Sequence, residues 1–360
     1  MNYGAGTITI ETETGAVISA GRYGIAAFGY DGGDITVTNY ATVTASGAAI
    51  DATTTAAGTV VVDNYGTITG NIIAANATFD NEVGAVWNFA GAAAFGIGTN
   101  ELINQGTIDT TGISSVATTG NLSISNTGTI NVESGSLVLS GGVSGTGSLT
   151  IGAGASLELN SAVSSGQTLT FEGSTGTLKL DNAPGFQGVI SGFTGNGQLS
   201  GSDHIDLADI NYNSGSFTES FNSTTDTLSV SDGTNSANIH FVGVYQAANF
   251  SFIGDGSGGT IVYDPPLSKG SVSPVGFEHA TGDGFVFKFA SVNRDTSPDL
   301  HFVNDALELG GVGFANAKPD LNQNHYEVHA NGVPGIEGHA STGFSEILKA
   351  QLHANDFHFV

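Results

Sequence analysis

The sequence predicts an all-β protein: a right-handed parallel β-helix (β-solenoid), followed by a β-rich cap and a mixed C-terminal region. Three observations predict this fold. The chain is rich in Gly and poor in charge, with 54 Gly in 360 residues and 11% charged residues. A degenerate repeat recurs about every two dozen residues. Within each repeat, aliphatic and small polar residues alternate, which is typical of strands with one buried side.

The repeat consists of an Asn, a Gly about two residues later, then Thr or another small residue, then an aliphatic residue. Its clearest copies are 64–68, 104–108 and 126–130. With looser copies included, the anchor positions are 15, 41, 66, 84, 106, 128, 154 and 176, a mean spacing of 23 residues. Solenoid repeats run to about 20 to 45 residues. Each coil therefore has room for two or three short strands and their turns.

Stacking of coils explains the residue types. Inward Ile, Val and Leu would form a continuous core, and Gly would supply positive φ at corners. An Asn at one corner of successive coils can bond amide to amide along the axis, whereas stacked charges would repel. We interpret 20–32 and 44–58 as coils with wider corners, and Trp87 with Phe89 as core rather than a sugar platform. A meandering antiparallel sandwich is the alternative fold.

Charge and composition exclude several functions. There are 33 acidic residues against 7 Lys plus Arg, a net charge of −26, so nucleic acid and anionic membranes are poor partners. The acidity indicates either cation binding or solubility alone. The absence of Cys removes disulfides and Cys-ligated zinc. No apolar run approaches the roughly 18 residues of a membrane span.

Changes in residue composition along the chain predict four regions. Residues 1–183 are the parallel β-solenoid repeats, and 184–264 are β-rich terminal coils and a cap, with a hairpin turn at Asp232-Gly233. Residues 265–274 are a Pro-containing linker, and 275–360 form a C-terminal secretion or targeting region with one helix at 345–354. The N-terminus lacks the basic and apolar parts of a Sec signal peptide. Its first coil also lacks a polar cap, which favours a longer parent protein.

The Asn-x-Gly-Thr-Ile coils resemble passenger regions of bacterial β-strand-repeat adhesins and autotransporters. The segments 186–190 and 203–207 resemble the module that follows such repeats in rhizobial surface proteins. The end of the chain, Asp356-Phe357-His358-Phe359-Val360, resembles the uncleaved signal of type I secretion substrates, including repeat-in-toxin proteins, with His358 a departure. Too little chain follows 265 for an autotransporter barrel. The resemblance therefore implies type I export from a Gram-negative bacterium.

Four aspartates are the candidate metal ligands. Asp203, Asp206 and Asp209 are spaced by three residues, and Asp255 lies in a Gly-rich turn. Oxygen-rich loops of this kind bind Ca²⁺, so calcium is the one cofactor we consider, although tandem repeat-in-toxin nonapeptides are absent. The alternative is that Asp203 caps a turn while Asp206 and Asp209 face solvent. His325 and His329 lack the Glu of a metalloprotease motif, and we interpret them as surface residues.

These features predict a secreted or cell-surface structural or adhesive protein, located outside the cell or on its outer surface, and not an enzyme. Its expected partners are host or surface glycans or proteins and the export machinery. A polysaccharide-active β-helix enzyme is the alternative, but Arg22 and Lys179, the only basic residues before 265, are far apart in the coil count. Ice binding through Thr7, Thr9, Thr36 and Thr38 is a further alternative, weakened by the irregular coils.

Overall fold

The computed structural model describes residues 6–55 and 58–264, together with the backbone of four short strands nearer the C-terminus. The chain divides into two compact units, Met1–Leu267 and Ser268–Val360. In the second unit, β29 (Glu278–His279) pairs with β30 (Phe285–Val286), and β31 (Lys318–Asp320) pairs with β32 (His325–Glu327). The predicted linker, the helix at 345–354 and the signal at Asp356–Val360 lie outside the described residues.

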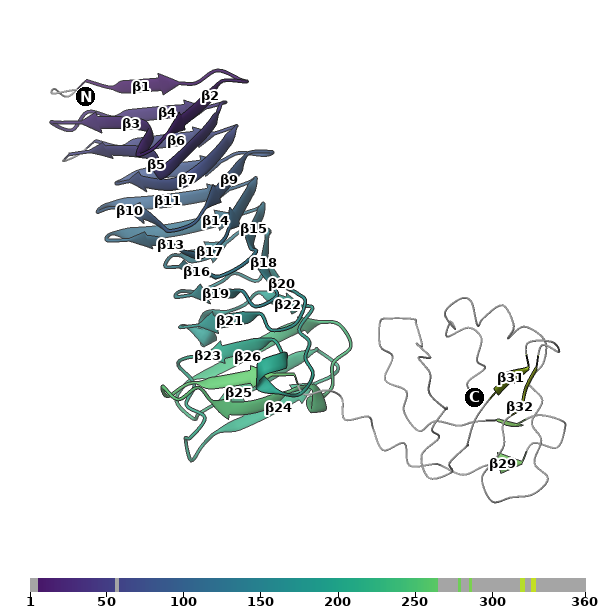
Figure 1. Ribbon diagram of the computed structural model, residues 1–360. Helices are drawn as coiled ribbons and strands as arrows, with labels where there is room; N and C mark the ends of the chain where they lie inside the picture. The colour runs from purple at the N-terminus through teal and green to yellow at the C-terminus, as the bar shows by residue number, and fades with distance from the viewer. Residues whose placement is uncertain are drawn as a thin grey trace. The chain divides into compact units, whose positions relative to one another are not determined.

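The first unit is a column of parallel coils with three faces (Figure 1). Face 1 is a seven-stranded parallel sheet. Its strands are β1 (Ile8–Glu11), β4 (Ile35–Asn39), β6 (Val60–Asn64), β8 (Ala77–Asn81), β11 (Thr99–Asn104), β14 (Asn121–Asn126) and β17 (Gly142–Ser144). Single bridges from Val143 to Val163 and from Val163 to Phe186 continue it.

Faces 2 and 3 form one hydrogen-bonded sheet, because β5 and β7 run from one face to the other. Face 2 consists of β2 (Val17–Ala20), the first parts of β5 (Thr42–Thr54) and β7 (Thr67–Ala74), β9 (Val86–Phe89), β12 (Thr107–Thr110), β15 (Thr129–Val132), β18 (Ser148–Gly152), β20 (Thr168–Glu172) and β22 (Val189–Ser191). Face 3 consists of β3 (Tyr23–Gly29), the remaining parts of β5 and β7, β10 (Ala92–Phe95), β13 (Ile113–Thr118), β16 (Ser136–Leu139), β19 (Ser156–Leu159), β21 (Thr177–Leu180) and β23 (His204–Leu207).

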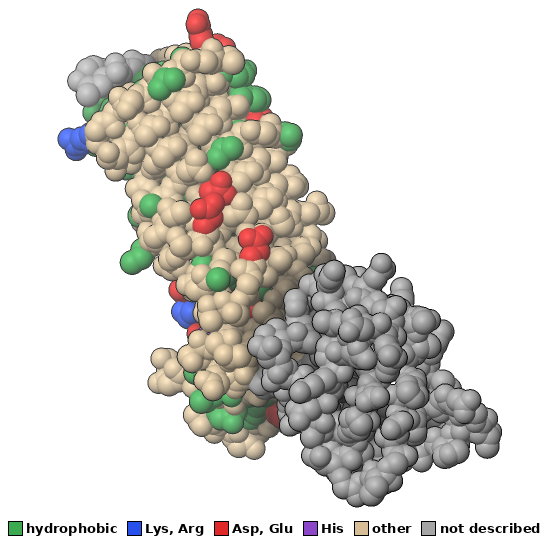
Figure 2. All heavy atoms as spheres, turned by 45° about the vertical axis from the view of Figure 1, so that its right-hand side comes forward, with side chains coloured by type: hydrophobic (Ala, Val, Ile, Leu, Met, Phe, Trp, Pro, Cys, Tyr) green, Lys and Arg blue, Asp and Glu red, His purple; other side chains and the backbone are tan. Residues whose placement is uncertain are grey.

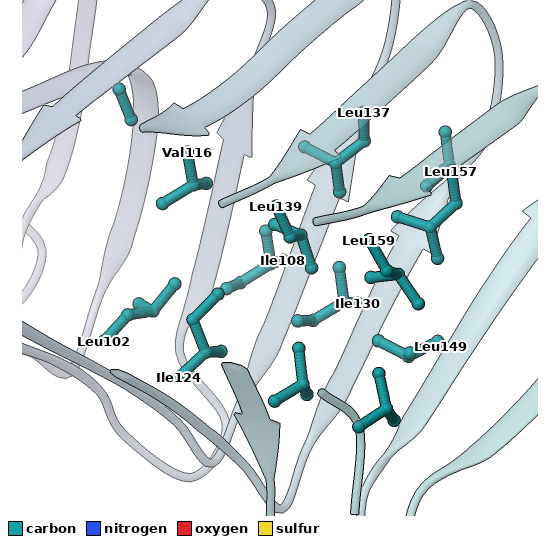
Figure 3. Close-up of a cluster of buried hydrophobic side chains, with 14 of the residues drawn as sticks. Leu102, Ile108, Val116, Ile124, Ile130, Leu137, Leu139, Leu149, Leu157 and Leu159 are labelled. Carbon is teal, nitrogen blue, oxygen red and sulfur yellow. The ribbon is translucent and has the colours of Figure 1, made fainter. Parts of the chain in front are cut away.

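Alternation along each strand sends aliphatic side chains inward. In β15, Ile130 and Val132 are buried, whereas Thr129 and Asn131 are half-buried on the outside. The parallel register stacks each inward side chain on the next, as Ile130 on Leu149. Figure 3 shows these side chains gathered between the faces. The predicted continuous core is therefore confirmed. Burial of each such side chain stabilises the fold by about 1.5 to 3 kcal/mol.

The predicted amide ladder is also present at the corner between faces 1 and 2. The side-chain amide of each Asn donates to the oxygen of the next at 2.8–2.9 Å, and the series starts with a Thr hydroxyl. Its members are Thr12, Asn39, Asn64, Asn81, Asn104 and Asn126, separated by 27, 25, 17, 23 and 22 residues. The ladder therefore sets the corner despite coils of unequal length.

Gln167 extends this ladder across a coil that has no Asn. The side chain of Asn126 donates to Gln167 Oε1 at 2.9 Å, and Gln167 Nε2 donates to the carbonyls of Asn126 and Ser144. Gly145 occupies the intervening coil, where a Cβ would lie 2.3 Å from the carbonyl oxygen of Asn126. The longer Gln side chain spans the space that Gly leaves open.

One sequence assignment within the repeats was wrong. The coil after Gly128 continues at Gly147, since Ser148 N donates to Gly128 O and Thr168 N to Gly147 O. The anchors at 154 and 176 belong to the corner before face 3. Gly followed by small residues marks any corner that precedes an inward-facing strand, so the pattern does not distinguish the corners. The segment 44–58 was predicted as a coil with wider corners, and 44–54 lies within β5, which bends through a register irregularity as it passes from face 2 to face 3.

The cap closes the lower end of the column (Figure 1). Its antiparallel strands are β24 (Thr218–Asn222), β25 (Thr227–Ser231), β26 (Ser236–Val242), β27 (Ser251–Gly254) and β28 (Thr260–Tyr263). The predicted turn at Asp232-Gly233 joins β25 to β26. β26 pairs with β22 of face 2, and β28 pairs antiparallel with β23 of face 3. These pairings cover the edges on which further coils would otherwise stack.

Candidate functional site

The first three predicted metal ligands are held separately by the fold. Asp203 is fully buried, and its two carboxylate oxygens accept from Gly176 N at 2.8 Å and Thr194 N at 2.9 Å. Burial raises its pKa to about 6, although these two hydrogen bonds oppose the shift. Asp206 lies outward on β23, and Asp209 accepts from Ala183 N at 3.3 Å.

Asp255, the fourth candidate, closes its own turn. Its Oδ1 accepts from Ser257 N at 2.7 Å and Gly259 N at 2.8 Å. Among the described residues, no three Asp, Glu or His side chains come together in a group that could hold a metal ion. Calcium binding stays a prediction.

A charged row crosses the outside of face 3 near the cap. Register places Glu158, Lys179 and Asp206 side by side on β19, β21 and β23. Lys179 Nζ lies 2.9 Å from Glu158 Oε1 and 3.1 Å from Asp181 Oδ1. This row was not predicted from the sequence, because its members lie 21 and 27 residues apart. Those separations equal one coil each, which was the available signal.

Asp206 is the perturbed member of this charged row. Desolvation by burial raises its pKa to about 6, and the nearby Asp255 carboxylate adds to the shift. Lys179 opposes it. Asp206 Oδ1 is buried and has no hydrogen-bond partner. The row therefore combines an ion-paired Lys with a carboxyl that can hold a proton near neutral pH.

A second acidic group lies at the corner of face 1. Asp63 and Asp80 are direct neighbours in the register, and burial together with the charge of Glu82 raises the pKa of each. Gln105 Nε2 donates to Asp80 Oδ1 at 3.2 Å. The hydroxyl of Tyr65 bonds Glu82, which raises the pKa of Tyr65. This group is the exception to the expectation that stacked acids are avoided.

Face 2 presents two ranks of small polar side chains. The register aligns the outward residues of successive strands, so that hydroxyls and amides lie one above another. The ranks contain Thr42, Thr67, Thr107, Thr129, Ser148 and Thr168, and Ser19, Thr44, Thr69, Asn88, Asn131, Thr150, Thr170 and Ser191. Val17, Val86, Val189 and Asp109 interrupt them. The Thr-aliphatic-Thr triplets in the sequence were the signal for these ranks.

The outer ranks are partly linked by their own hydrogen bonds. Asn131 Nδ2 donates to Asp109 Oδ1 at 2.7 Å, and Thr150 Oγ1 donates to Asn131 Oδ1 at 2.6 Å. Ser148 Oγ donates to Thr129 Oγ1 at 3.1 Å. By contrast, the Thr ranks expected on face 1 are short, because Thr36 and Thr38 are followed by Val61 and Asp63. Figure 2 shows a side of the column dominated by uncharged polar groups and backbone, with few acidic patches.

Two other sequence interpretations have clear outcomes. Trp87 is fully buried, its Nε1 donates to Gly70 O at 2.9 Å, and its ring stacks on Phe89, so it belongs to the core as predicted. His325 lies in β32, whereas His329 lies outside the described residues. In the part of the chain that the structure describes, no helix combines the length and apolarity needed to cross a bilayer.

These features define the class of the protein as a capped parallel β-solenoid. No protein-family model matches the chain, and no curated protein matches it.

Proposed function

We propose that this chain is a secreted or cell-surface adhesive protein that presents face 2 of its solenoid to glycans or proteins. The observation that carries the proposal is the in-register pair of hydroxyl and amide ranks along face 2. Neutral hydroxyl ranks on a rigid sheet match the hydroxyls of neutral glycans. The net charge of −26 disfavours anionic partners.

Binding tests this proposal through variants on two faces. Thr67→Glu and Thr129→Glu place charge on face 2, and Ser125→Glu is the matched control on the outside of face 1. A glycan and cell-binding screen should lose its signals with the face 2 variants and keep them with the control. Equal binding by all variants would count against face 2.

Export and calcium are parts of the same proposal with separate tests. Removing residues 345–360 should abolish export through a type I system, and equal export of both chains would remove that assignment. If calcium binds the predicted aspartates, it should raise the unfolding temperature. Superimposable thermal scans with calcium and with chelator would remove the calcium prediction.

The charged row of face 3 favours a second candidate function, cleavage of polysaccharides. Glycosidic hydrolysis uses a pair of carboxyl groups, one of them with a raised pKa, and Asp206 and Glu158 lie on either side of Lys179 in this row, with the pKa of Asp206 raised to about 6. Asp206→Asn should then lower turnover of a polysaccharide by about 100-fold or more. Absence of turnover across a polysaccharide panel would dismiss this candidate.

The ranks of face 2 also bear on ice binding. Val86 and Asp109 interrupt them, and this disfavours a continuous ice-like array. An ice recrystallisation assay on the same face 2 variants separates this alternative from glycan binding.

A further inference from the structure

The outward side chains of face 2 are hydrogen-bonded differently in its two parts. In the C-terminal part, most of them bond one another, as Thr150 does with Asn131 at 2.6 Å. The hydroxyl oxygens of Thr170 and Ser191 lie 2.8 Å apart. In the N-terminal part, six outward side chains have no hydrogen-bond partner among the residues that the structure describes. They form what we call the open patch, and they are Thr42, Thr44, Thr67, Thr69, Asn88 and Thr107.

The open patch is a double row along the column axis. In the first row, Thr42 lies beside Thr67. In the second row, Thr44 lies beside Thr69, and both rows continue through β9 to β12. Neighbouring strands of a sheet lie about 4.8 Å apart, and successive outward residues of one strand lie about 6.7 Å apart. The patch therefore offers hydrogen-bonding groups on a regular grid across the four coils that contain β5, β7, β9 and β12.

The open patch is uncharged and mixes polar with apolar groups. Each Thr carries a methyl group beside a hydroxyl that can both donate and accept, and Val86 adds further methyl groups to the first row. Asp109 follows Asn88 in the second row, and its carboxylate accepts from Asn131 Nδ2 at 2.7 Å. A neutral sugar has the complementary surface, with hydroxyls at the edges of its ring and C–H groups on the ring faces. Its edges can bond the hydroxyls of the patch while a ring face covers the methyl groups.

The grid favours a chain of sugars over a single sugar. A flat sheet surface makes few contacts with one sugar, whereas a chain shares one loss of translational freedom among several contacts. In an extended β-1,4-linked chain of glucose units, each sugar advances by a distance close to the spacing of strands, so successive sugars meet successive coils. An α-1,4-linked chain of the same sugar curves into a helix, and only a short part of it can follow the rows.

We propose that the open patch binds an extended, neutral β-1,4-linked glycan chain, with about one sugar for each coil along the column axis. This inference rests on the proposed function, because it names the ligand class of face 2 and places the contact on four of its coils. A chain longer than the patch would continue onto the C-terminal part, where Thr129 follows Thr107 in the first row.

Calorimetric titration of the purified full chain compares cello-oligosaccharides of increasing length with maltohexaose. Affinity should rise at least about tenfold from cellobiose to cellotetraose, because each added sugar adds hydrogen bonds, and should change less than about threefold from cellotetraose to cellohexaose. Maltohexaose contains as many glucose units as cellohexaose and should bind at least about tenfold more weakly. Equal binding of the two hexasaccharides, affinity that is independent of chain length, or no binding of any cello-oligosaccharide would overturn the inference.

Variants locate the contact on face 2. Thr67→Val combined with Thr69→Val removes two hydroxyls of the open patch, keeps the β-branched shape and should weaken cellotetraose binding at least about tenfold. Thr168→Val is the matched control, because Thr168 also faces outward on face 2 without a hydrogen-bond partner in the described part of the chain, but lies outside the patch. It should bind cellotetraose like the unmodified chain. Circular dichroism checks that each variant folds.

Unchanged binding in the double variant, or an equal loss in Thr168→Val, would also overturn the inference. Its failure is distinguishable from failure of the proposed function. If the glycan and cell-binding screen still loses its signals with Thr67→Glu, face 2 keeps its adhesive role and only the β-1,4-linked ligand is excluded.

Discussion

The coils and the cap bury their polar groups in different ways. In the coils, the corner is filled by neutral amides from Asn39 to Asn126, each bonded to the next, with Thr12 and Gln167 at the two ends. In the cap region, the buried polar groups include the carboxyls of Asp203 and Asp264, whose pKa values are raised to about 6 and about 7. A repeating coil stacks like on like, so a buried charge would repel its own copy. The cap interrupts the repeat and can bury single carboxyls with unlike partners.

The largest expected effect of a substitution comes from breaking the ladder. Asn104→Ala leaves the side-chain oxygen of Asn126 without its donor and removes the acceptor of Asn81, so we expect a loss of about 3 kcal/mol. Asn88→Ala, on the outside of face 2, is the control and should change stability by under about 0.5 kcal/mol. Denaturant unfolding followed by the fluorescence of Trp87, the only Trp in the chain, measures both. Equal losses of stability would show that the buried amides of the ladder contribute no more than an exposed Asn.

The second prediction uses the pH dependence of the cap. The pKa of Asp264 is raised from 3.8 to about 7, so the folded state binds its proton more tightly than the unfolded state. Its ionisation therefore removes stability as the pH rises from about 4 to 7, on the order of 4 kcal/mol at about 1.4 kcal/mol per pH unit. Melting temperatures at pH 5 and 8 measure the difference. Asp264→Asn should reduce the difference, and an unchanged difference would contradict the assignment.

A smaller effect is expected at the charged row, where the coils do carry charge. Lys179→Met leaves Glu158, Asp181 and Asp206 without their shared cation and should cost up to about 1 kcal/mol at neutral pH. The loss should shrink with added salt. Stability curves in low and high salt measure it. A salt-independent loss would indicate packing of the Lys stem instead.

The smallest effect is expected on the outside of face 2. Thr42→Val removes an exposed hydroxyl and keeps the β-branched shape, so stability should change by under about 0.5 kcal/mol. Its denaturation midpoint, measured beside that of Asn104→Ala, compares the outer and inner polar ranks of the column. A loss above 1 kcal/mol would assign the outer rank a structural role.

The sequence predicted much of the column but little of the candidate sites. The Asn residues of the ladder, such as Asn104 and Asn126, could be recognised in the sequence because an Asn recurs about one coil later. Stacked coils place these Asn side chains next to one another. The pairing of Lys179 with Asp206 could not be recognised in the sequence, because neither residue repeats in successive coils. Their proximity depends on the length of the coil between them. The convergence of Ser202 on the carbonyl of Asp264 joins residues 62 apart through cap strands that have no repeat.

By itself, the sequence determined the period-two alternation, the coil of about two dozen residues and the amide corner, because these follow from local pattern and repetition. Only the tertiary structure decided which corners coincide, where Gln167 bridges a coil without Asn, and which carboxyls are buried. Those outcomes depend on the register between coils of unequal length. Register is fixed by the packing of the whole column, which the sequence of one coil does not contain.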